Sequence, residues 1–217
     1  MASAEAVLRL DANGTPRTIR LLAALVDFES RHFADAATKP AENDLVRAFR
    51  GGATPAVPIC EFLVRIQRSN YLFDGAVYVL AGAYLARFMR TRAARDAGIL
   101  VEPATAHRLV SVAVLLGAKF ISPRHFERRV EAFQICSDKS IRASEISRLE
   151  LLFLRAVDYR IFIGAEEFQR FFKVMERGPK PPSASSGSQK RKAETAPDRE
   201  EKKPRRVRAC QLPAVAS

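Results

Sequence analysis

Residues 107–120, HRLVSVAVLLGAKF, contain a nearly continuous run of apolar positions. Between Leu109 and Leu116 only Ser111 is polar, so apolar side chains occupy every face of the helix that this pattern predicts. A helix of this kind is surrounded by other helices rather than lying on the surface of a bundle. The run ends at Lys119, and we therefore expect this lysine at the rim of the core.

A second apolar helix is predicted in residues 144–161, SEISRLELLFLRAVDYRI. Its apolar stripe at helical spacing consists of Ile146, Leu149, Phe153, Ala156 and Val157. Glu150 is the acid inside its apolar middle. If the two apolar helices pack in one bundle, Lys119 and Glu150 reach the surface at one edge. They would mark an apolar patch with opposite charges, an arrangement that can bind a helical partner.

The region from Arg20 to Glu176 has helical patterns throughout, turns at Gly and Pro, and no convincing strand alternation, which predicts an all-α fold. The other predicted helices are Arg20–Ala34, Ile59–Gln67, Asp74–Thr91, a central helix after Pro103 with Thr105 as its N-cap, one beginning at Ser122–Pro123, and a short one in AEEFQRFFKVM.

Positive charge is concentrated at the end of the chain. From Arg177 onward there are eleven Lys or Arg and four Asp or Glu, so this segment carries +7 of the net charge of +12. This segment is rich in Pro, Ser, Gly, Lys and Glu and has no periodic apolar pattern, which predicts disorder over residues 177–217. The high isoelectric point therefore gives no evidence for an ordered nucleic-acid-binding domain, and we do not expect a nucleic-acid partner.

The basic segment also contains two clusters separated by ten residues, the spacing of a bipartite nuclear import signal. The clusters consist of Lys190 and Arg191, followed by Lys202, Lys203, Arg205 and Arg206. We expect an import receptor as a partner and the nucleus as the location, with the cytoplasm as a second location. A solvated run of charge and nonspecific contact with nucleic acid are the alternative interpretations.

Signals of catalysis or of a bound cofactor are weak. The histidines at positions 32, 107 and 125 are isolated and are expected to be caps or surface residues, and the three cysteines lie far apart without a CxxC pair. Gly51-Gly52 lacks the sequence context of a phosphate-binding loop. We therefore predict no catalytic residue, metal, cofactor or small-molecule substrate. No apolar run approaches the roughly 20 residues of a membrane span, so no membrane partner is expected.

The order of YLARF, AKF and LELLFL along these helices resembles the cyclin family, most closely the single-box P-type (U-type) cyclins of plants. The best-matched pieces are PAVPICEFLVRI, HRLVSVAVLLGAKF and ISRLELLFLRAVDYRIFI. The resemblance covers residues 43–176 and implies one cyclin box of five helices around the central apolar helix. Residues 1–42 would then form an N-terminal segment with one extra helix, and residues 177–217 a tail.

The resemblance implies a regulatory subunit without catalysis of its own. It would bind and activate a cyclin-dependent serine/threonine kinase, as a heterodimer, in control of the cell cycle or cell division. In the family, a Lys at the end of the third box helix and a Glu in the fifth meet the kinase, and these match Lys119 and Glu150. Phe120 and Leu154 would cover apolar surface beside them.

A purely structural interpretation of the same pair stays open. A lysine at a helix C-terminus is stabilised by the helix dipole, by roughly 0.3–1 kcal/mol. Glu150 could pair with Lys119 in the free protein, or with Arg148 or Arg155 nearby.

Several positions depart from the family pattern. Ala86 stands where the family has an acid, and Ala56-Val57 stands where it has the matching Arg, so both halves of an internal pair are missing together. The acids that commonly follow AKF are replaced by residues 121–126, ISPRHF, which makes that edge more basic. The alternative function is therefore a cyclin-fold nuclear protein that associates with nucleic acid or a transcription complex without activating a kinase. Thr54-Pro55 and Ser122-Pro123 have the form that proline-directed kinases modify, and neither is assigned a role.

Overall fold

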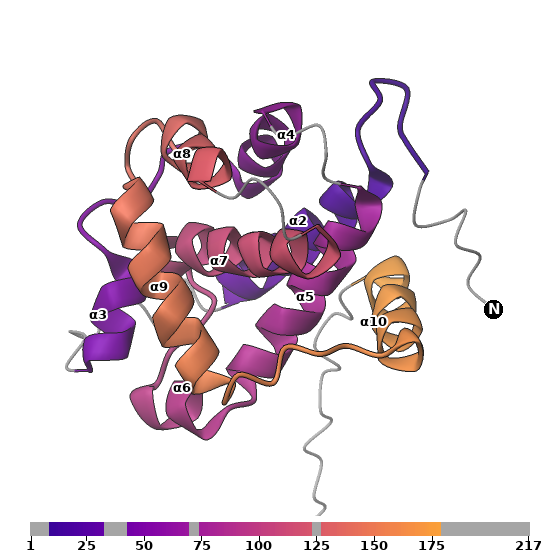
Figure 1. The fold of residues 1–217 in the computed structure, drawn as a ribbon. Helices are drawn as coiled ribbons and strands as arrows, with labels where there is room; N and C mark the ends of the chain where they lie inside the picture. Colours follow the sequence, from indigo (N-terminus) through magenta and orange to yellow (C-terminus); the bar gives the residue numbers. More distant parts are fainter. Residues whose placement is uncertain (1–8, 33–42, 70–73, 123–126, 179–217) are drawn as a thin grey trace, which may run out of the picture. The chain divides into compact units, whose positions relative to one another are not determined.

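The fold is built around one buried helix, α7 (Pro103–Ile121). A computed structural model describes residues 9–32, 43–69, 74–122 and 127–178, all within one unit of the chain, residues 1–181 (Figure 1). These residues form helices and no strand beyond one isolated bridge, which confirms the all-α prediction. The other helices are α2 (Arg17–His32), α3 (Asp44–Arg50), α4 (Ile59–Ser69), α5 (Gly75–Met89), α6 (Arg92–Ala97), α8 (Glu127–Cys136), α9 (Ala143–Ala156) and α10 (Ala165–Arg177).

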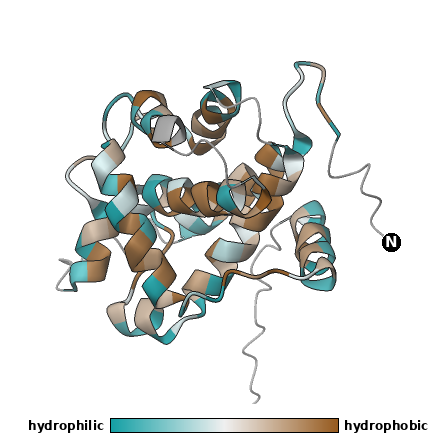
Figure 2. Cartoon of the chain, in the orientation of Figure 1, coloured by the Kyte–Doolittle hydropathy of each residue, from teal (hydrophilic) through white to brown (hydrophobic). Residues whose placement is uncertain are grey.

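Helix α7 is surrounded as its composition predicts. Every residue from Thr105 to Ala118 is buried, and α5, α3, α9, α2 and α8 all pack against it (Figures 1 and 2). Gly117 permits the close approach of α5, because a Cβ there would lie 2.8 Å from the carbonyl oxygen of Val77. By length and composition alone α7 would pass as a membrane span, but the same properties are found in core helices of soluble proteins.

The start of α7 differs from the prediction that Thr105 is its N-cap. Glu102 occupies the cap position with an extended backbone, and Pro103 takes the first helical position, where its missing N–H costs nothing. Thr105 is the third residue of the helix. Its hydroxyl accepts a hydrogen bond from the Glu102 N–H at 3.1 Å and donates to the Leu100 carbonyl at 2.6 Å. The threonine therefore stabilises the first turn from inside the helix.

The N-terminal helix α2 is part of the same packed unit. Its buried face, which includes Ile19, Leu22 and Val26, lies against α4 and α5, and α10 also contacts it. Two short helices, α3 and α6, were not expected from the sequence. Each ends at a glycine with positive φ, Gly51 and Gly98, and each is too short to show a full apolar period.

Helix α9 ends at Ala156 and not, as predicted, near residue 161. The reason is local: Asp158 and Tyr159 both have φ near +55°, at 55° and 54°, which a right-handed helix cannot contain. The chain then runs without helix to α10. The predicted helix start at Ser122–Pro123 falls largely on residues 123–126, outside the described part. The basic segment from residue 179 onward, with its two Lys/Arg clusters, also lies outside it.

Candidate functional site

Lys119 and Glu150 are brought together by the packing of α7 against α9. The Lys119 Nζ lies 2.5 Å from Oε1 and 2.6 Å from Oε2 of Glu150. The lysine side chain is 35 % exposed and the carboxylate 14 % exposed, so the pair lies at the rim of the core, as expected. Of the partners considered for Glu150, the one that the structure selects is Lys119, and not Arg148 or Arg155.

The position of each residue follows from its helix. Lys119 lies in the last turn of α7, where a positive charge complements the helix dipole. Glu150 follows the buried Leu149 on α9, at the flank of the helix that adjoins α7. The ion pair therefore lies between the core and the surface.

Several apolar residues that follow this pair in the sequence are exposed or half-buried. Phe120 is 39 % exposed, Ile121 40 %, Leu151 42 % and Phe162 76 %, whereas Leu154 is half-buried. We call Lys119, Phe120, Ile121, Glu150, Leu151, Leu154 and Phe162 the α7–α9 patch. The rings of Phe120 and Phe162 lie with their centroids 6.3 Å apart, so the patch is continuous between the end of α7 and the segment after α9.

Phe162 owes its position to α5. Arg87 donates hydrogen bonds to the carbonyl oxygens of Arg160 and Phe162, the latter at 3.1 Å, and forms an ion pair with Glu167 of α10 at 2.6 Å. The Tyr84 hydroxyl donates to the Ile161 carbonyl at 2.8 Å. Burial raises the pKa of Tyr84 to about 12, so this hydroxyl remains a donor at neutral pH.

Arg87 and Phe162 were not identified as functional residues from the sequence. Arg87 belongs to YLARF, which was recognised only as part of the family pattern. Its role depends on a contact with residues more than seventy positions later, for which a single sequence gives no signal. Leu151 could have been found, because it follows Glu150 directly and is apolar on the side of α9 opposite its buried stripe.

The expectation that the histidines are caps or surface residues was wrong for His107, which is buried. Its Nε2 lies 2.7 Å from the Val57 carbonyl oxygen, and its ring packs edge-on against Phe62. Burial lowers the pKa of His107, so the ring is neutral at pH 7 and its Nε2–H donates to Val57. This histidine ties α7 to the residues before α4.

Neither a metal cluster nor a disulfide is found in the described residues, where Cys136 is buried and Cys60 half-buried as free thiols. The α7–α9 patch combines one ion pair with exposed apolar side chains. Such a surface can bind another protein.

The sequence profile of the family described as Cyclin matches residues 20–161, from inside α2 into the segment that follows α9. The chain belongs to the cyclin family. Cyclins are regulatory proteins and not enzymes. The cyclin match begins inside α2, the helix that packs against α4 and α5.

Curated plant cyclins are similar to this cyclin over most of its length. Cyclin-P2-1 of Oryza sativa subsp. japonica is 31 % identical over 172 residues, which are 76 % of this chain and 73 % of that protein. Cyclin-P4-1 of the same species is 28 % identical over 168 residues, or 76 % and 75 % of the two chains. Cyclin-U1-1 of Arabidopsis thaliana is 24 % identical over 132 residues, covering 61 % and 59 %.

Proposed function

We propose that this cyclin is the regulatory subunit of a cyclin-dependent serine/threonine kinase, which it binds and activates through the α7–α9 patch. The observation that carries the proposal is the Lys119–Glu150 pair, together with the exposed apolar side chains that follow each of its residues in the sequence. A charge pair surrounded by apolar surface can orient a partner helix by its end groups while the rim excludes water.

The apolar rim supplies binding energy that the free protein does not use. Fully burying an exposed Leu or Phe side chain contributes about 1.5–3 kcal/mol. Phe162 and Leu151 are exposed enough for a partner to bury most of this surface. The free energy gained from these contacts would have to exceed the free-energy cost of association. The patch would therefore need both its exposed apolar side chains and its ion pair.

Activation would follow from a difference in affinity for two states of the kinase. A kinase is active when its C helix lies inward and its Lys–Glu pair holds the ATP phosphates. A partner that binds the inward state more tightly than the outward state shifts the kinase population toward the inward state, by an amount set by the difference in affinity for the two states. The patch suits this task because α7 is fixed in the core and Arg87 fixes the backbone that carries Phe162.

The first experiment is co-purification of the full-length chain with a panel of cyclin-dependent kinases. We expect capture by the wild type and its loss in a Lys119→Ala, Glu150→Ala double variant that retains the helical circular-dichroism spectrum. Leu151→Ala should weaken capture, whereas Val174→Ala on α10 serves as the matched control, because the two side chains are 42 % and 46 % exposed. Equal capture by all four chains would refute the patch as the kinase-binding surface.

We further propose that the two basic clusters beyond the described residues direct this cyclin to the nucleus through an import receptor. Changing Lys202, Lys203, Arg205 and Arg206 to Ala in a fluorescent fusion should move the signal to the cytoplasm. An unchanged nuclear signal would refute this proposal.

The alternative, association with nucleic acid, makes a different prediction. Affinity for duplex DNA would fall steeply as salt rises, because phosphate contacts release counterions. Kinase binding through an apolar patch would change little over the same salt range. A steep salt dependence combined with no kinase capture would favour the alternative.

A further inference from the structure

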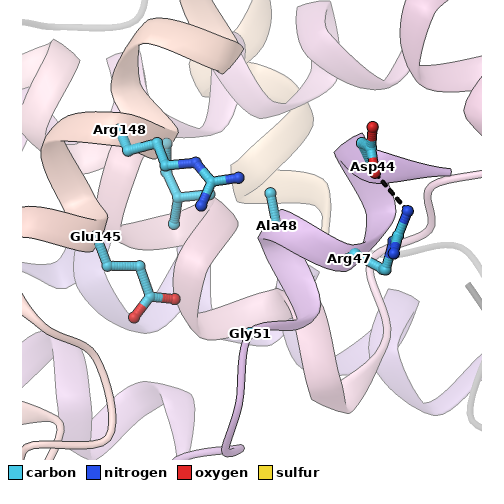
Figure 3. Close-up of a pocket in the computed structure, with 7 residues that line it drawn as sticks. Asp44, Arg47, Ala48, Gly51, Glu145 and Arg148 are labelled. Atoms are coloured by element: carbon cyan, nitrogen blue, oxygen red, sulfur yellow. Dashed lines mark hydrogen bonds and ion pairs between the residues drawn. The ribbon is translucent and has the colours of Figure 1, made fainter.

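A hollow lined by basic side chains lies between the α3–α4 connection and the beginning of α9. It encloses about 670 Å³ and shares Glu145 and Arg148 with a neighbouring hollow of about 350 Å³ between α3 and α9 (Figure 3). Its cationic lining residues are Arg108, Lys139, Arg142 and Arg148. We call these four residues, together with the adjoining Gly52 and Ala53, the basic pocket.

The charges of the basic pocket are only partly compensated. Arg108 is buried, and its Nε lies 2.5 Å from Oε1 of Glu145, the acid of this pocket. Lys139, Arg142 and Arg148 are exposed, and none of them has an ion-pair partner among the described residues. Three cations around one hollow therefore favour an anionic group with more than one negative charge, such as a phosphate monoester.

The chain has three Ser/Thr-Pro dipeptides, and one of them adjoins this pocket. Thr15 is only 7 % exposed, and Ser122 is the half-buried C-cap of α7, with its N–H bound to the Ala118 carbonyl at 2.9 Å. Thr54, before Pro55, is exposed and lies outside any helix. A proline-directed kinase needs a hydroxyl on an accessible, non-helical segment, so Thr54 is the accessible candidate of the three.

Thr54 directly follows two residues of the basic pocket. Gly52 and Ala53, the two residues before it, line the hollow. The Ala53 carbonyl accepts a hydrogen bond from Nη1 of Arg108 at 2.8 Å, which fixes the loop beside the exposed cations. Lysine and arginine side chains are long and flexible, so those of the pocket can turn to a phosphate on the next residue of the loop.

We propose that Thr54 is a phosphorylation site for a proline-directed serine/threonine kinase, and that the basic pocket binds the resulting phosphate. In the reaction the Thr54 Oγ1 forms a bond to the γ-phosphorus of ATP and loses its proton to the kinase. The bond between that phosphorus and the β–γ bridging oxygen breaks, and ADP leaves. The new phosphothreonine, with a charge between about −1.5 and −2 at pH 7, then ties the α3–α4 loop to the beginning of α9.

This site is separate from the kinase-binding surface proposed above. Glu145, in the first turn of α9, pairs with Arg108 near the start of α7, whereas Glu150 pairs with Lys119 in the last turn of α7. The modifying kinase need not be the partner of the α7–α9 patch. Failure of one proposal therefore leaves the other in place.

The first arm of the test identifies the modified residue. Full-length wild type and Thr54→Ala are incubated with a proline-directed kinase and Mg-ATP, and the phosphorylated positions are located by mass spectrometry. We expect phosphate at Thr54 in the wild type and its absence in the variant. Modification of Ser122 or Thr15 without Thr54 would overturn the assignment.

The second arm tests the pocket with full-length protein that carries genetically encoded phosphothreonine at position 54. We expect the modification to raise the melting temperature by about 2–4 °C. We also expect the second pKa of the phosphate, followed by ³¹P NMR, to lie below its ordinary value of about 6, because nearby cations favour the dianion. Both effects should disappear when Lys139, Arg142 and Arg148 are changed to Gln.

A control variant removes three other exposed arginines by the changes Arg68→Gln, Arg92→Gln and Arg95→Gln. It loses the same net charge but leaves the basic pocket intact, so both effects of the phosphate should persist. Equal effects in the pocket variant and in the control would show that the phosphate responds to net charge alone. That result, or the absence of any effect in the wild type, would overturn the proposal.

Discussion

Replacing Arg108 with alanine should destabilise this protein more than the loss of any exposed arginine. The Arg108 side chain is 1 % exposed and donates three hydrogen bonds. Its Nε reaches Glu145 at 2.5 Å, Nη1 reaches the Ala53 carbonyl at 2.8 Å, and Nη2 reaches the Ser140 carbonyl at 3.1 Å. This one side chain therefore connects α7 to the loop before α4, to Ser140 in the α8–α9 connection and to Glu145 in the first turn of α9.

The magnitude follows from these contacts. Each hydrogen bond of a charged donor contributes about 1.5–3 kcal/mol in favourable cases, but Glu145 is 25 % exposed and Ala53 is exposed, so water can replace part of what is lost. Counting about 1 kcal/mol for each of the three bonds gives a loss of roughly 3 kcal/mol. Arginine and alanine have similar helix propensities, so the α7 backbone adds little to this difference.

The assay is urea denaturation at pH 7, followed by circular dichroism. We expect Arg108→Ala to lower the free energy of unfolding by about 3 kcal/mol, which corresponds to a fall in melting temperature of roughly 6–12 °C. Arg142→Ala, an exposed arginine of the same pocket, should stay within about 0.5 kcal/mol of the wild type. Equal midpoints for the two variants would refute the reasoning, because they would show that burial and the three contacts contribute nothing.

Two further predictions concern residues next to this network. Gly51→Ala should lower the free energy of unfolding by about 1–3 kcal/mol, because φ is 61° and ψ −165° at Gly51 and a Cβ would lie 2.3 Å from the Arg108 guanidinium. Gly52→Ala is the control, because a Cβ at Gly52 would have no atom within 4 Å. Equal urea midpoints for the two variants would contradict the account. The lowered pKa of His107 means that the unfolded chain binds the proton more readily, so stability should be complete above pH 6.5 and fall as the pH drops below it. His107→Gln should reduce this loss between pH 7.5 and 5.5, and an unchanged pH dependence would contradict the assignment.

The parts of the fold that the sequence predicted are those with long apolar patterns. Helix α7 could be predicted because its apolar run covers every face, and α9 because its apolar stripe has a helical period. Helix α9 was predicted too long, because the apolar pattern continues into Val157 and Ile161 while the backbone turns at Asp158. The seven residues of α3 and the six of α6 are too short for a period to appear.

The candidate site was predicted in its centre but not at its edges. Lys119 and Glu150 were expected at one edge of the bundle because each is the charged residue at an interruption of an apolar helix, and the family resemblance connected them. Their pairing with each other was one of three alternatives, and the structure selects it. Phe162 could not be placed, because its position depends on the hydrogen bond from Arg87 to its backbone. Arg108 was also missed, since an arginine near the start of an apolar helix gives no sign of its partners in the loop before α4 and at Ser140.

The most direct test of the central claim is the rate at which a captured cyclin-dependent kinase phosphorylates a Ser-Pro peptide as the full-length cyclin is added. Our account predicts a saturable increase in rate with the wild type. The increase should be absent with the Lys119→Ala, Glu150→Ala double variant and retained with Val174→Ala. A kinase that binds this cyclin without any increase in rate would contradict the claim that the α7–α9 patch activates its partner.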